Sequence, residues 1–276
     1  MNKYILPNIL ALLVTAATSP AFALVIDDGV VLPPANHVVN PSQPVAGISQ
    51  AVLAEQWWQW ALSTPAATNP LLDTTGAAAH INNDGPVFFL AGDQVGSGSV
   101  RNFTVPVGKP VFFPLINFVD LEVPTEGVDV NSAFSFIQGV GGATNLHATL
   151  DGLDLLTFSS FRQTSTAFFT VNLPASLRDA FHFEDKYVGA LDAVADGYWV
   201  ALDGLSAGPH TLVFGGFIPE FVNGPGAAPV TVTAQSTAII TAVPVPQTFA
   251  LFLSGLGLVG IAARRRSKLA VDSLAG

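Results

Sequence analysis

Two carboxylates, Asp120 and Glu122, stand two residues apart just after the predicted strand Pro110–Phe118. Because alternate residues of an extended chain point to the same side, both carboxyl groups should share one face. Such a pair could act as acid and base in glycoside hydrolysis, where the carboxyl groups lie about 5 Å or about 6.5–9.5 Å apart. It could also bind a calcium ion, or it could be solvated at the rim of a sheet. The spacing leaves all three alternatives open and favours the solvated pair.

The other residues that could take part in catalysis or metal binding match no known motif. The chain has no cysteine, which excludes disulfides, thiolate catalysis and cysteine-ligated zinc. Its histidines lack the H-x-H and H-E-x-x-H spacings of metal sites, and no G-x-S-x-G nucleophile elbow occurs. They are His37, His80, His147, His182 and His210. The sequence therefore favours a protein without catalysis, metal or cofactor.

Three tryptophans, Trp57, Trp58 and Trp60, form the most distinctive cluster. At helical spacing Trp57 and Trp60 share a face and are predicted to fill the core. Trp58 lies off that face and is the candidate for a surface position, where an indole ring can stack on a sugar. A lectin-like carbohydrate-binding module is therefore one alternative function. A secreted polysaccharide hydrolase that uses the carboxylate pair is the other.

Two helices are predicted in the body of the chain. Residues 49–62 form the longer one, with Ser49 as its N-cap and Pro65 beyond its end. Residues 24–48, rich in Pro and Asn, are predicted to be an extended lead-in. Pro174–His182 predicts a short second helix.

The rest of the body predicts β-strands. Nine segments rich in β-branched and aromatic residues alternate with Gly, Pro and Asn turns. They are Pro86–Ala91, Val100–Val105, Pro110–Phe118, Asn145–Leu150, Leu153–Phe158, Ala167–Leu173, Tyr198–Leu202, His210–Phe214 and Val230–Ile240. Asp151-Gly152 predicts a two-residue hairpin. Residues 49–240 are therefore expected to form one mainly β domain, an antiparallel β-sandwich or jelly roll with one packed N-terminal helix.

The N-terminus has the parts of a secretory signal peptide. Lys3 precedes the apolar stretch Ile5–Ala17, and Ala21 and Ala23 form a small-x-small cleavage site. We expect residues 1–23 to pass through the secretion translocon and to be removed by signal peptidase.

The C-terminal tail also has three parts. Pro244 and Pro246 break incoming structure. The uncharged run 249–263 predicts a transmembrane helix, although its roughly 15 residues span only about 22 Å. A basic cluster then remains on the cytoplasmic side, followed by the cytoplasmic tail 269–276.

This tail, residues 243–268, resembles the PEP-CTERM sorting signal of Gram-negative bacteria. The resemblance implies processing by the membrane protease exosortase. The residues that carry it are Pro244, Pro246, Gly255, Gly257, Arg264, Arg265 and Arg266. The family has a glutamate between the two prolines, where this chain has Val245. Residues 255–260 also match the G-x-G-x-x-G dinucleotide pattern, but no strand precedes them and no acidic residue follows at about 20 positions, so a cofactor site is rejected.

Four segments of the body resemble a group of exported bacterial proteins without a settled activity. They are residues 55–60, 85–92, 107–114 and 196–199. This resemblance spans most of the body and implies no catalytic residue.

The charge of the chain agrees with export. Of ten basic and twenty acidic residues, five basic and one acidic lie in the two terminal signals, so the body carries a net charge of −14. Such a charge repels nucleic acid and anionic lipid. We expect an exported cell-surface or exopolysaccharide-matrix protein, whose precursor is inserted in the inner membrane before it reaches the cell envelope or the extracellular space. Exopolysaccharide is the expected partner there.

Overall fold

The computed structural model describes residues 38–92, 98–155, 158–224 and 226–244. The chain divides into two units, Met1–Ala242 and Val243–Gly276, and the fold described here is that of the first. The predicted signal peptide, most of the lead-in and nearly all of the sorting segment lie outside the described residues.

Helix α1 (Gln50–Ser63) forms where the sequence predicts it. The Ser49 hydroxyl accepts a hydrogen bond from the amide of Val52, which caps the first turn. The helix ends two residues before Pro65, which cannot continue it. Helix α3 (Ala175–Ala180) lies within the predicted second helix. Helix α2 (Val130–Phe134) was not predicted, although Asp129 caps it through two backbone amides.

Within the described residues, ten strands form two sheets of five strands each. Sheet 1 has the order β1-β3-β8-β6, with β7 also paired to β8. Its strands are β1 (Phe88–Phe89), β3 (Val111–Glu122), β6 (Arg162–Thr164), β7 (Phe169–Leu173) and β8 (Gly189–Leu202). The central pair is antiparallel and runs from Val111 opposite Leu202 to Glu122 opposite Asp192. Only two residues of the predicted strand 86–91 form β1, which pairs with β3 in parallel.

Sheet 2 has the order β2-β10-β9-β4-β5. Its strands are β2 (Val100–Pro106), β4 (Thr144–Leu150), β5 (Leu153–Asp154), β9 (Gly208–Phe221) and β10 (Val230–Val243). The hairpin between β4 and β5 is confirmed, because Leu150 pairs with Leu153 and both Asp151 and Gly152 have positive φ.

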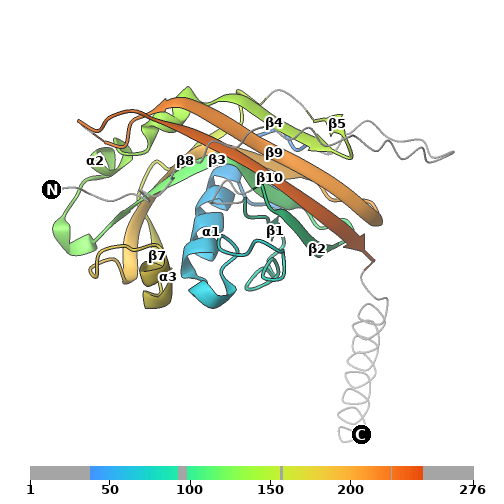
Figure 1. The fold of residues 1–276 in the computed structure, drawn as a ribbon, viewed down its shortest axis with the longest axis horizontal. Coiled ribbons are helices and arrows are strands. Elements are labelled where there is room, and N and C mark those ends of the chain that lie inside the picture. The colour runs from blue at the N-terminus through green and yellow to red at the C-terminus, as the bar shows by residue number, and fades with distance from the viewer. Residues whose placement is uncertain (1–37, 93–97, 156–157, 225, 245–276) are drawn as a thin grey trace, which may run out of the picture. The chain divides into compact units, whose positions relative to one another are not determined.

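Sheet 1 lies between α1 and sheet 2 (Figure 1), and its central strands β3 and β8 are largely buried on both faces. One face packs against α1, where Trp57 contacts Trp199 with ring centroids 5.3 Å apart. The other face shares an apolar cluster with sheet 2, where Phe113 and Phe214 lie 4.7 Å apart. The mainly β class is confirmed, whereas the sandwich or jelly-roll assignment stays a prediction.

The edges of the sheets are covered by side chains and loops. The amide side chain of Asn83 makes both hydrogen bonds to the backbone of Phe89, at 2.7 and 2.9 Å, and so imitates a neighbouring strand along β1. Gln59 of α1 donates to the carbonyl of Thr170 in β7 at 3.0 Å. The Ser63 hydroxyl accepts from the amide of Asn172 at 3.3 Å. Gln59 and Ser63 of α1 therefore cover the edge of β7 that faces away from β8.

Candidate functional site

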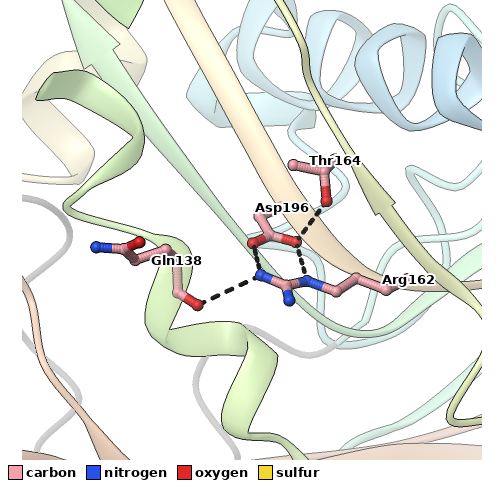
Figure 2. A network of polar contacts seen from close by, with 4 residues as sticks. All are labelled: Gln138, Arg162, Thr164 and Asp196. Carbon is pink, nitrogen blue, oxygen red and sulfur yellow. Dashed lines mark hydrogen bonds and ion pairs between the residues drawn. The ribbon is translucent and has the colours of Figure 1, made fainter. Parts of the chain in front are cut away.

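An ion pair with a buried carboxylate lies where the short strand β6 pairs with β8 in sheet 1 (Figure 2). Asp196 of β8 has no exposed surface and accepts from Arg162 Nε at 2.9 Å and from Arg162 Nη2. The hydroxyl of Thr164 donates to the same carboxylate at 3.2 Å. Arg162 also donates to the carbonyl of Gln138 at 3.4 Å. Three separate segments of the chain are thereby joined.

The guanidinium of Arg162 lies close to the backbone at Gly141, and this position leaves no room for a side chain there. A Cβ atom at Gly141, in the turn after Gln138, would lie 2.5 Å from Arg162 Nη1. Burial raises the pKa of the Asp196 carboxyl, and the hydrogen bonds from Arg162 oppose that rise. The hydrogen bond to Asp196 raises the pKa of Arg162 in turn. Both oxygens of this carboxylate already accept hydrogen bonds. We therefore interpret the ion pair as stabilising the fold, and Asp196 is not placed to act as a general base.

The predicted carboxylate pair lies on the same sheet. Asp120 and Glu122 both belong to β3 and are only 3 % and 2 % exposed. The expectation that they are solvated at a sheet rim is therefore wrong, because residues packed on sheet 1 cover this end of the strand. Burial raises the pKa of the Tyr187 phenol, and these two carboxylates contribute to the rise. Within the described part of the chain, no three His, Cys, Asp or Glu side chains are grouped so that they could hold a metal ion.

The tryptophans of α1 belong to the core. Trp57 donates its indole N–H to the carbonyl of Leu90 at 3.0 Å, and Trp60 donates to that of Ile81 at 2.8 Å. This confirms the predicted core positions. The expectation that Trp58 lies at the surface is wrong, because its side chain is 4 % exposed and its ring packs edge-on against Trp57 at 5.0 Å. A ring buried to this extent offers no open face to a sugar.

A serine, a histidine and an aspartate meet where the start of β9 lies beside the hairpin between β4 and β5, and their spacing in the sequence does not predict this cluster. His210 contacts Asp151 Oδ2 through Nδ1 at 2.8 Å, and Ser206 Oγ lies 3.3 Å from Nε2. However, Nε2 lies closer, at 2.9 Å, to the backbone carbonyl of Ser206. A carbonyl only accepts, so Nε2 carries a proton in this bond and has no lone pair left to activate the hydroxyl. The cluster therefore links a loop to a hairpin and does not form a nucleophilic triad.

The sorting residues lie beyond the sheets. Strand β10 ends at Val243, and Pro244 after it is exposed. The other predicted sorting residues, and the cleavage residues Ala21 and Ala23, are outside the described residues. Within residues 38–92, 98–155, 158–224 and 226–244, no helix has the length and apolar character needed to span a bilayer.

Part of the chain matches a known sequence motif. Residues 242–266 match the model of the PEP-CTERM protein-sorting motif. No curated protein and no solved structure matches the chain. The matched segment begins at the end of β10 and includes both prolines and the basic cluster. The chain therefore carries a PEP-CTERM sorting signal and is an exported protein, destined for the cell envelope or the outside, that is processed by an exosortase and the general secretion machinery.

Proposed function

We propose that the protein is a non-catalytic component of the cell surface or exopolysaccharide matrix of a Gram-negative bacterium, which exosortase releases from its membrane-inserted precursor. The sorting motif at residues 242–266 carries this proposal. The net charge of −14 on the body supports it, because such a charge keeps an exported protein soluble and away from anionic lipid.

The position of the motif supports release of an intact body. Ala242 is the last β10 residue in register with β9, opposite Gly208, and it is buried. The prolines at 244 and 246 follow at once. Cleavage at or after this pair leaves every strand of both sheets with the body, so processing does not require the folded unit to give up a structural element.

The proposal is tested with the full chain, tagged after residue 23 and at Gly276, in cells with and without exosortase. With exosortase, we expect the C-terminal tag to be lost and the body to appear in the envelope or the medium. Without it, both tags should remain on one chain in the inner membrane. Retention of both tags in both strains would contradict the proposal.

Val245 gives a sharper version of this experiment. The PEP-CTERM family has glutamate at this position, so Val245→Glu should increase the rate at which the C-terminal tag is lost. Val245→Gln, which has nearly the same shape without the charge, is the matched control and should not. Equal rates in all three chains would show that the residue between the prolines does not limit processing.

A further inference from the structure

The outward face of sheet 2 carries no charged side chain along the central parts of β2, β9 and β10. On these strands alternate residues point into the core shared with sheet 1, and the intervening residues point away from it. The second set defines the outer face: Asn102, Thr104, Thr211, Val213, Gly215, Phe217, Thr233, Gln235, Thr237, Ile239 and Thr241. Most of these residues are exposed.

The outer face contains none of the few charged residues of this chain. Charged residues make up only 11% of the sequence, and the nineteen acidic residues of the body lie outside the eleven positions of this face. In the register, Asp154 of β5 lies opposite Thr149 and therefore on the same face, at its margin beyond β4, while Glu220 and Asp151 lie at the ends of β9 and of the neighbouring hairpin. The outer face is therefore a neutral area on a strongly acidic protein.

The register shows how the polar groups of the outer face are arranged. His147, Gly215 and Gln235 lie side by side on β4, β9 and β10. Thr149, Val213 and Thr237 form the next row. Rows on one face are about 6.6–6.8 Å apart, and neighbouring strands about 4.7–4.9 Å. Hydroxyl, amide and imidazole groups thus alternate with apolar surface at spacings of a few ångströms.

The ring of Phe217 adds an aromatic surface to this pattern. Phe217 lies beside Gly215 on β9, opposite Thr233, and is half-buried without belonging to the core cluster. Gly215 contributes no side chain between Val213 and Phe217, because a Cβ there would lie 2.1 Å from the carbonyl oxygen of Ala234. The edge of the ring is therefore not flanked by a bulky neighbour on that side.

We propose that the outer face of sheet 2 binds a neutral polysaccharide. Sugars present hydroxyls that match the threonine and amide groups, and C–H faces that match the ring of Phe217 and the aliphatic side chains. The net negative charge of the body favours a neutral polymer as the ligand. An anionic polymer, or a second copy of this body, brings negative charge towards a protein of −14, whereas a neutral polymer meets no repulsion. This inference names the partner in the proposed matrix role and rests on that role for its setting.

Affinity electrophoresis tests the proposal with the purified full chain in a polyoxyethylene detergent, which has no sugar headgroup. The native gels contain dextran or hydroxyethyl cellulose as neutral probes, or alginate as an anionic probe. We expect retardation in at least one neutral gel and none in alginate. Normal mobility in both neutral gels, or retardation in alginate alone, would overturn the proposal.

Matched variants locate the binding surface. Thr233→Val with Thr237→Val keeps the β-branched shape and removes two hydroxyls, so affinity should fall about tenfold. Thr170→Val makes the same change on an exposed position of β7 in sheet 1 and should leave affinity unchanged. Phe217→Ala should also weaken binding, and Phe217→Tyr should restore it.

The readouts separate this inference from the proposed function. Equal affinity of the double variant and the wild type would overturn the outer face as the binding surface. A doubled mass in size-exclusion chromatography that the double variant abolishes would assign the face to self-association instead. Neither result bears on loss of the C-terminal tag, which tests sorting on its own.

Discussion

The central strands of sheet 1, β3 and β8, are largely buried on both faces, but the two faces are covered in different ways. On the helix side, Trp57 and Trp199 pack with Phe112, whose ring stacks on Trp199 at 5.3 Å. On the side of sheet 2, aliphatic side chains and phenylalanines form the cluster, and the buried Asp196 with its partner Arg162 lies where the short strand β6 pairs with β8.

The difference shows where polar groups are tolerated in this core. On the helix side, the indole N–H groups of Trp57 and Trp60 donate to backbone carbonyls, so these large rings can be buried without a second polar side chain as partner. On the opposite side, Asp196 needs a partner supplied by a separate strand. The first arrangement depends on helix packing, and the second depends on the placement of β6.

The largest expected effect tests the helix side. Trp57→Ala should lower the free energy of unfolding by about 3–5 kcal/mol, because it leaves a cavity between α1 and sheet 1. Trp57→Phe keeps most of the ring but leaves the Leu90 carbonyl without its donor, and should cost about 1–3 kcal/mol. Urea unfolding of each chain measures both values. Val52→Ala, at an exposed position of α1, is the control and should change the value by less than about 0.5 kcal/mol.

The next effect tests the ion pair. Arg162→Met leaves the buried Asp196 without its charged partner and should cost about 2–3 kcal/mol, towards the low end for a buried pair because Arg162 is 35 % exposed. Arg162→Met with Asp196→Leu should recover most of that loss. If the double variant is as unstable as the single one, the loss of stability in Arg162→Met is not caused by leaving the charge of Asp196 buried without a partner.

A smaller effect is that the loss of unfolding free energy in Arg162→Met should depend on pH. Burial raises the pKa of Asp196 above its ordinary value of 3.8, so in the window between the two values the folded chain binds more protons than the unfolded one. Ionisation of Asp196 therefore lowers stability as the pH rises through this window. Without Arg162 the pKa rises further, so the deficit of the variant should grow from about pH 4 towards neutrality. Lys186→Met, which breaks the exposed pair with Glu126, should show no such growth.

The smallest effect concerns the edge of β7. Gln59→Ala removes the hydrogen bond to Thr170 and should cost about 1 kcal/mol. It also uncovers part of a strand edge, so sedimentation should detect more self-association at high concentration. Gln56→Ala on the same helix is the control. Identical sedimentation of the two variants would show that Gln59 does not protect this edge.

Sequence patterns predict correctly those elements that are determined by neighbouring residues, such as caps and turns. The helix at 50–63 follows from its cap and the proline after it, and the 151–152 hairpin follows from its turn residues. Strand β8 was predicted only from Tyr198, whereas it begins at Gly189. Its first half is rich in alanine and contains Asp192, residues that have low strand propensity, so pairing with β3 and β7 and not propensity makes it a strand.

The candidate sites show the same limit. Asp196 and Arg162 are 34 positions apart, and β6, which brings Arg162 to the pair, is a polar strand of three residues with no local signal. The spacing of Asp120 and Glu122 correctly placed both in one strand but could not show that neighbouring elements cover them. Trp58 was misplaced because helical spacing assigns faces, while burial depends on how many sides of the helix are packed.

The strand order of sheet 2 has a consequence for biogenesis. The last strand, β10, joins β2 to β9, so β2 has no partner among the other strands of that sheet until residues 230–243 are present. A chain that emerges from the membrane N-terminus first therefore keeps sheet 2 in two separate pieces until its final stretch has crossed. Folding of that sheet is completed only as the sorting motif itself reaches the membrane, which leaves little time between maturation of the body and its release.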